Sequence, residues 1–220
     1  MLSNILQLLS LYRRFFTTGL LVIFSLVFLF FFTESASFSP VLQRFIVSLV
    51  FLLIIPLVYS RMVMKEPLSN IGFRKGHFLT GLSLGILSVV CAFGVFWWLV
   101  LFFPSFKEAY ILPGLVQTSF LWFIFYELVL MAIMVMLYEI FFRGLIQIFW
   151  LKDLHMWGIL LQVIFFLIFS INDISWQRAP LLLFCPFAGM IAYFSKSLWY
   201  SSVASWTFLF LVDIFFLISH

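Results

Sequence analysis

Glu139 and Arg143 are the two side chains whose chemical types and spacing most clearly indicate a functional site. They follow a strongly apolar stretch, because fifteen of the eighteen residues from Leu121 to Tyr138 are neither charged nor polar. Their i, i+4 spacing places them one turn apart on one helical face, where a carboxylate and a guanidinium can pair. Charged side chains inside a membrane are costly and mark functional sites by default. The alternative interpretation is a structural ion pair that locks one helix into a bundle.

The composition indicates a helical membrane protein. The chain has 220 residues, 65% of them hydrophobic and 9% charged, and its mean hydropathy is +1.24. Backbone polar groups in lipid must be satisfied internally, so only helices or a closed barrel can span it. The apolar stretches are long and do not alternate with a period of two, which favours helices. The formal charge of +4 is small, so we expect the lipid bilayer, and not nucleic acid, as the partner.

We predict an all-α fold, a polytopic transmembrane helical bundle of about seven helices. The predicted helices cover residues 15–32, 45–59, 78–103, 119–137, 156–171, 179–194 and 198–218. The fourth is expected to continue into the Glu139 segment. The first could instead belong to a signal peptide, because Ser35-Ala36-Ser37 follows it, but its length favours a retained helix. Gly81, Gly85, Ser88 and Ala92 form a stripe of small residues in the third helix, which allows close helix packing.

The basic residues predict the orientation of the bundle. If residues 1–14 are cytoplasmic, eight basic residues fall on the cytoplasmic side and three on the opposite side, leaving Arg143 inside. The eight are Arg13, Arg14, Arg61, Lys65, Arg74, Lys75, Lys152 and Lys196, and the three are Arg44, Lys107 and Arg178. We therefore expect a multi-pass protein of a bacterial-type cytoplasmic membrane, with its N-terminus in the cytoplasm.

The segment around Glu139 resembles a known motif. CAAX-processing and bacteriocin-processing (CPBP) intramembrane proteases carry Glu-Glu-x-x-x-Arg, often ending in Phe-Arg-Gly. Glu139, Phe142, Arg143 and Gly144 occupy matching positions. The first glutamate of the family motif, its catalytic one, falls on Tyr138.

The second and third motifs of the family are altered in the same way. The second, Phe-x-x-x-His, aligns with Phe166 and places its histidine on Ser170. The third, His-x-x-x-Asn, places its histidine on Ser205 and its asparagine on Leu209. By this resemblance, residues 70–220 form a CAAX-protease-like transmembrane core.

Residues 1–69 then form two additional transmembrane helices and a cytoplasmic loop. This division gives the predicted domain organisation of the chain.

The resemblance implies intramembrane peptide-bond hydrolysis, in which a glutamate activates water, histidines orient it and an asparagine holds the oxyanion. Tyrosine is a poor base at neutral pH, and serine cannot replace an imidazole that accepts and donates protons. The Leu209 side chain has no hydrogen-bond donor for an oxyanion. We therefore expect that peptidase activity is lost or much reduced. The alternatives are an active CAAX-type or bacteriocin-immunity-type protease that uses Glu139 as base, a non-catalytic scaffold for a prenylated or transmembrane peptide, and a small transporter subunit.

Three further carboxylates are secondary candidates, namely Glu127, Asp173 and Asp213. Glu127 lies eleven residues before Tyr138, about three turns and ~16 Å along one helical face. Glu127 and Asp213 would suit a proton pathway, although the chain lacks the paired broken helices of transporters. The histidines lack ligand spacing, so we expect no metal and no cofactor.

Overall fold

The computed structural model describes residues 2–33, 40–103, 105–106, 110, 112–171 and 178–219. Residues 2–11 and 40–41 are described by their backbone only. All regular elements in the described residues are helices, which confirms the predicted all-α fold. The predicted site residue Asp173 lies outside the described residues.

The first part of the chain forms three long helical rods and a short 3₁₀ turn. They are α1 (Leu2–Phe31), the continuous rod of α2 (Pro40–Leu49), η1 (Val50–Ile54), α3 (Ile55–Val58) and η2 (Tyr59–Val63), the 3₁₀ turn η3 (Leu68–Ile71), and α4 (Phe78–Phe102). The elements η1 and η2 are π-helical. The rods are built from the apolar stretches because lipid offers no partners to backbone N–H and C=O groups.

The second part contains the longest apolar rod, two short helices and three longer ones. The short helix α6 (Gly114–Thr118) precedes the rod. The rod itself consists of α7 (Phe120–Phe125), η4 (Tyr126–Met131), α8 (Ala132–Tyr138) and η5 (Glu139–Trp150). It is followed by the short η6 (Lys152–Leu154) and by the longer helices α9 (Trp157–Ser170), α10 (Ala179–Ser195) and α11 (Leu198–Ser219). The expected continuation of the fourth helix into the Glu139 segment is confirmed. The segments η4 and η5 are π-helical. This geometry is rare in proteins, and where it occurs it is often found at functional sites.

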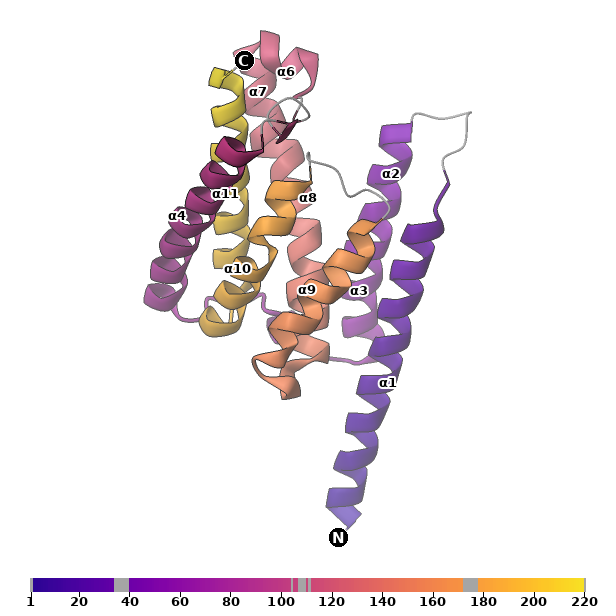
Figure 1. The fold of residues 1–220 in the computed structure, drawn as a ribbon. Helices are drawn as coiled ribbons and strands as arrows, with labels where there is room; N and C mark the ends of the chain where they lie inside the picture. The colour runs from indigo at the N-terminus through magenta and orange to yellow at the C-terminus, as the bar shows by residue number, and fades with distance from the viewer. Residues whose placement is uncertain are drawn as a thin grey trace.

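The chain passes up and down through one helical bundle. Figure 1 shows α4, α10 and α11 grouped at one side, the α7–η5 rod and α9 in the middle, and the α2–η2 rod with α1 at the other side. Helices α4, α10 and α11 all pack on one another, and η5 contacts both α9 and α10. The segment that carries Glu139 therefore lies in the middle of the molecule.

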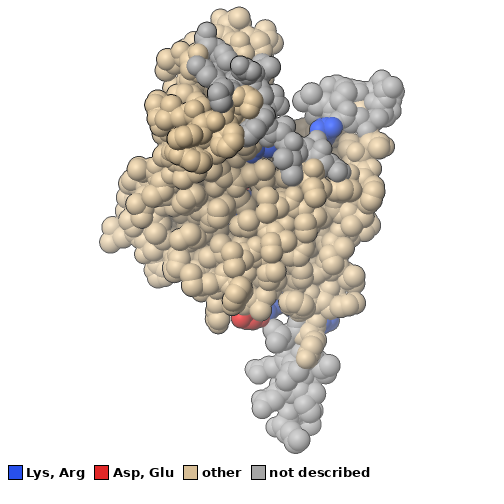
Figure 2. Space-filling model, viewed as in Figure 1, with Lys and Arg blue, Asp and Glu red and all other residues tan. Residues whose placement is uncertain are grey.

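The helices have the length and surface of membrane spans. Five described helices are long and apolar enough to cross a membrane, namely Tyr12–Phe31, Leu42–Val63, Phe78–Phe102, Phe120–Trp150 and Leu198–Ser219, whereas the apolar helices Trp157–Ser170 and Ala179–Ser195 are shorter. Figure 2 shows a wide band without Lys, Arg, Asp or Glu between charged atoms at the two ends of the visible face. A multi-pass membrane protein follows from this surface.

Two apolar clusters form the core. One surrounds η5 and includes Tyr138, Phe142 and Phe166. The other joins α4, α10 and α11, and it includes Phe184, Phe208 and Leu209. The predicted stripe of small residues in α4 is buried along its whole length, and Gly81 packs directly on the Tyr200 ring of α11. These clusters hold the α7–η5 rod against α10 and α11.

Candidate functional site

Glu139 and Arg143 pair inside the bundle, as their spacing predicts. Arg143 Nε lies 3.6 Å from Glu139 Oε1, and each side chain is 2% exposed. The Ser205 hydroxyl of α11 donates a 2.9 Å hydrogen bond to the same carboxylate oxygen. One oxygen of Glu139 thus faces both a guanidinium and a hydroxyl, whereas Oε2 has no hydrogen-bond partner among the described residues.

Two donors on η5 bind the backbone of α10. Arg143 Nη2 donates to the carbonyl of Cys185 at 3.2 Å, and Gln147 Nε2 donates to the carbonyl of Gly189 at 2.7 Å. The donors are four residues apart, and so are the acceptors. The Arg143 guanidinium carbon also lies 5.5 Å from the centre of the Phe166 ring, a distance at which a cation and a ring attract each other. Arg143 is therefore held from three sides and serves as a fixed charge.

A second glutamine extends this polar network into α9. Gln162 is fully buried, and its Nε2 donates to the Cys185 carbonyl at 3.4 Å. Gly189 leaves room for the two carboxamides, because a Cβ there would lie 2.8 Å from Gln162 Nε2 and 3.3 Å from Gln147 Oε1. Sequence reasoning missed both glutamines. Two signals were present, since Gln147 lies one turn beyond Arg143 and Gln162 interrupts an otherwise apolar helix.

Tyr138 has different surroundings from its neighbour Glu139. Its ring centre lies 5.8 Å from that of Phe166 and 5.9 Å from that of Phe169. It lines a cavity of about 500 Å³, which we call the Tyr138 pocket. The described lining residues do not include Glu139 or Ser205. Tyr138, where the resemblance to CPBP proteases places a catalytic glutamate, and the carboxylate of Glu139 therefore do not share this cavity.

The Tyr138 pocket lies between the N-terminal rods and the centre of the bundle. Its lining is mainly apolar and comes from the end of α1, from α2, η4, α8 and α9. Met131, Met134 and Phe169 form its apolar wall together with Tyr138. Such a cavity has the size of pockets that hold small apolar ligands or chains.

The remaining motif positions are buried. Ser170 ends α9 and is 2% exposed. Leu209 belongs to the apolar cluster of α4, α10 and α11. Of the predicted site residues, the structure thus brings Glu139, Arg143 and Ser205 into direct contact.

Glu127 and Asp213 form a second buried polar cluster. Both side chains are fully buried, Glu127 on η4 and Asp213 on α11, and neither carboxylate oxygen of Glu127 has a hydrogen-bond partner among the described residues. Trp206 Nε1 also donates to the backbone carbonyl of Glu127 at 2.8 Å. The Trp206 hydrogen bond therefore joins η4 to α11.

Tyr110 completes the second cluster from the loop that follows α4. Its hydroxyl donates a 2.5 Å hydrogen bond to Asp213 Oδ1. Burial, followed by the nearby Asp213 carboxyl, raises the pKa of Tyr110 above its ordinary value, so the phenol remains a donor. Sequence reasoning missed Tyr110, because a single tyrosine in a loop gives no signal of a partner 103 residues away.

The described side chains form no group of three or more His, Cys, Asp or Glu residues that could hold a metal ion. Comparisons with protein-family models, with curated proteins and with solved structures found no match to this chain. The geometry of the two polar clusters and of the Tyr138 pocket is therefore the basis for assigning a function.

Proposed function

We propose that this protein is a non-catalytic membrane scaffold of the CPBP type that holds a prenylated or transmembrane peptide in the Tyr138 pocket. One observation supports it above all others. Glu139 is buried and engaged by Arg143 and Ser205, whereas Tyr138 lines a cavity of about 500 Å³. The residue that could act as a base is thus separated from the cavity that could hold a substrate.

The chemistry of hydrolysis explains why this separation matters. A general base must come within hydrogen-bond reach of the water that it activates, and a developing oxyanion needs donors that are already in place. In the described residues, Glu139 directs one oxygen to Ser205 and Arg143, and the Leu209 side chain lies in an apolar cluster. A phenol at position 138 is a poor base at neutral pH and does not activate water.

The pocket lining suits an apolar chain that is already dissolved in the membrane. In lipid, helices and ligands associate mainly through close packing and hydrogen bonds, because lipid tails are as apolar as the protein. Met131 and Met134 have flexible, polarisable side chains that adapt to irregular chains, and both line the pocket. Selectivity would then come from the fit of the chain to this lining.

Filling the pocket tests the proposed function. A fluorescent farnesylated peptide should bind to the purified protein in nanodiscs, and Met134→Trp should weaken binding about tenfold or more because the indole occupies the cavity. Leu160→Trp is the matched control, because Leu160 is 54% exposed on α9 and does not line the pocket. Equal binding to the native protein and to Met134→Trp would refute the assignment of the pocket.

We also propose the cytoplasmic location of the N-terminus that the charge distribution predicts. Four of the eight basic residues assigned to one side, Arg14, Arg74, Lys152 and Lys196, line one common cavity, and Arg44 and Arg178 of the opposite side line the other. This grouping supports the assignment of the two sets of basic residues to opposite sides of the membrane. Single cysteines at Lys196 and Thr118, in a background without Cys91 and Cys185, should react with impermeant maleimide from opposite sides of the membrane, with Lys196→Cys inside. Labelling of Lys196→Cys from outside would refute the orientation.

A further inference from the structure

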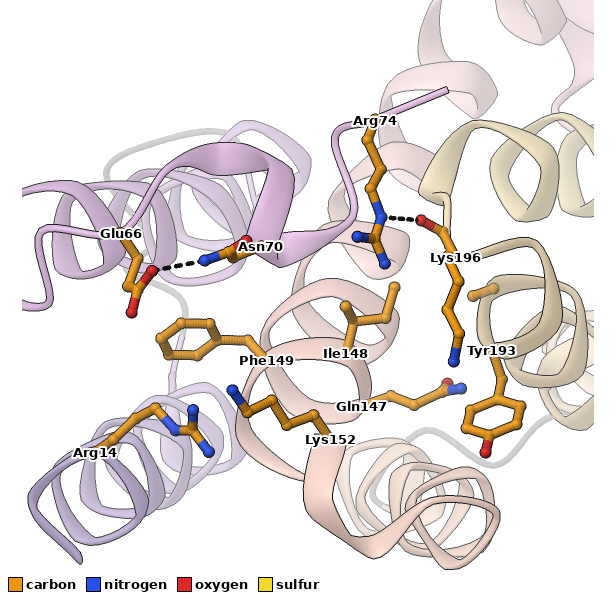
Figure 3. Close-up of a pocket in the computed structure, with 11 residues that line it drawn as sticks. Arg14, Glu66, Asn70, Arg74, Gln147, Ile148, Phe149, Lys152, Tyr193 and Lys196 are labelled. Atoms are coloured by element: carbon orange, nitrogen blue, oxygen red, sulfur yellow. Dashed lines mark hydrogen bonds between the residues drawn. The ribbon is translucent and has the colours of Figure 1, made fainter. Parts of the chain in front are cut away.

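A second cavity lies at the other end of the bundle, where η5 ends. It has a volume of about 270 Å³ and is lined by side chains from α1, from the segment around η3, from η5 and η6, and from the α10–α11 turn. Figure 3 shows Arg74 and Lys196 extending above η5 and Lys152 and Arg14 on its other side. We call this cavity the basic pocket.

The basic pocket carries an excess of positive charge. Among the described residues, its lining includes four cationic side chains, Arg14, Arg74, Lys152 and Lys196, and a single carboxylate, Glu66. Part of this charge is balanced within the protein. Arg14 forms a 2.7 Å ion pair with Asp153, and Glu66 accepts a 2.6 Å hydrogen bond from Asn70.

Arg74, Lys152 and Lys196 have no carboxylate partner within salt-bridge distance among the described residues. Their charges therefore remain available to an anion.

Two of these cations are held in place by a network of backbone contacts. Arg74 Nε donates to the Lys196 carbonyl at 2.6 Å, and the Ser197 hydroxyl donates to the Arg74 carbonyl at 2.6 Å. The backbone N–H of His77 donates to the Ser195 carbonyl at 2.8 Å. Gly76, at φ +58°, lies against the same carbonyl, where no Cβ would fit. The backbone that carries these two basic side chains is thus fixed before a ligand binds.

Lys196 itself adopts a left-handed backbone conformation with φ +58°. Lysine is disfavoured there relative to glycine or asparagine. Its ammonium lies 4.2 Å from the centre of the Tyr193 ring.

Gln147 provides a buried polar group at the bottom of the basic pocket. It lines the cavity, is 3% exposed, and donates its N–H to Gly189. Its Oε1 has no hydrogen-bond partner among the described residues. A ligand that carries both an anionic group and a hydroxyl would satisfy the cations and this oxygen together.

The location of the basic pocket indicates the source of such a ligand. Gln147 and Lys152 flank the end of the Phe120–Trp150 span, and Lys196 precedes the start of the Leu198–Ser219 span. The ends of membrane spans lie near the lipid headgroups. Basic pockets between helices at this depth bind anionic headgroups.

We infer that the basic pocket binds the phosphate of a hydroxyl-bearing anionic headgroup, with Arg74, Lys152 and Lys196 contacting the phosphate and Gln147 accepting from the hydroxyl. Phosphatidylglycerol has this chemistry. Glycerol phosphate in solution presents the same groups without the lipid chains.

Two charge-matched double variants test the inference. Lys152→Gln/Lys196→Gln removes two charges from the pocket, whereas Lys65→Gln/Lys75→Gln removes two charges that do not line it. Lys65 is a close control for Lys196, because its φ is +55°. Nanodiscs that contain phosphatidylcholine with a few per cent of phosphatidylglycerol, followed by native mass spectrometry, report the lipid retained by the full chain.

The native protein and the Lys65→Gln/Lys75→Gln variant should retain phosphatidylglycerol in preference to phosphatidylcholine. The Lys152→Gln/Lys196→Gln variant should lose this preference by about tenfold or more. An equal loss in both variants would show attraction by diffuse surface charge and overturn the inference. No preference in the native protein would overturn it as well.

Glycerol phosphate distinguishes the two sources of the phosphate. Added to protein in neutral detergent, it should raise the unfolding temperature only weakly, because the lipid chains contribute to binding. A large rise that depends on Lys152 and Lys196 would assign the pocket to a soluble ligand in place of the lipid.

Discussion

The hydroxyl of Ser205 donates to the carboxylate of Glu139 at 2.9 Å, although 66 residues separate them in sequence. Ser205 stands where the resemblance to CPBP proteases places a histidine. The contact joins η5 to α11 at the same carboxylate oxygen that faces Arg143. A position expected to orient a catalytic water therefore holds two helices together.

The buried pair of Glu139 and Arg143 should matter far more to stability than an exposed pair. Glu139→Gln or Arg143→Met alone leaves an uncompensated buried group and should lower the free energy of unfolding by about 3–5 kcal/mol, by analogy with soluble interiors. The double variant should lose less than the sum of the two. Unfolding in mixed detergent micelles measures all three.

The ion pair of Arg14 and Asp153 is the matched control for this measurement. Its N–O distance is 2.7 Å, but the Asp153 side chain is 59% exposed. Asp153→Asn should therefore cost about 1 kcal/mol or less. Similar losses for the exposed and the buried pair would contradict the structural role of Glu139 and Arg143.

Gly144 should tolerate no side chain. A Cβ there would lie 2.6 Å from Ile71 Cγ2 and 2.9 Å from the Ile71 carbonyl oxygen, so η3 would have to move away from η5. Gly144→Ala should destabilise the protein by about 1–3 kcal/mol. Around Gly94 in α4, no atom lies within 4 Å of the position that a Cβ would occupy, so Gly94→Ala should be neutral or slightly stabilising. A neutral Gly144→Ala would argue against the close approach of η3.

Tyr110 should make the stability of the protein sensitive to alkaline pH. The folded state raises the pKa of Tyr110, because the phenol is buried next to Asp213. The unfolded chain releases this proton above about pH 10 and the folded chain keeps it, so the stability present below pH 10 is lost as the pH rises further. Thermal unfolding between about pH 8 and 11 should show a steeper loss for the native protein than for Tyr110→Phe.

At neutral pH, Tyr110→Phe should itself cost about 1–3 kcal/mol, since the Asp213 carboxyl loses its donor. Tyr12→Phe, at an exposed position on α1, is the control for general alkaline effects. Identical pH profiles for the native protein and Tyr110→Phe would contradict the contribution of this hydrogen bond.

The helices were predictable because lipid leaves a long apolar stretch few other conformations. The third and seventh predicted helices, residues 78–103 and 198–218, match α4 and α11 to within one residue at each end. The π-helical geometry of η5 was not predictable, since it depends on hydrogen-bond register and not on composition.

The site was predictable only where its members are close in sequence. The pairing of Glu139 with Arg143 follows from a four-residue spacing. The contacts of Ser205 with Glu139 and of Tyr110 with Asp213 depend on how α11 packs, which no local pattern encodes. Gln147 was overlooked because a glutamine near a helix end ordinarily faces water.

Peptide turnover tests the proposed non-catalytic function most directly. The purified native protein and Glu139→Gln should be incubated with a farnesylated peptide and a leader-type peptide, and the products followed by mass spectrometry. The account predicts that the farnesylated peptide binds and that neither protein yields cleavage products. Cleavage by the native protein that disappears in Glu139→Gln would contradict it and would identify Glu139 as the catalytic base.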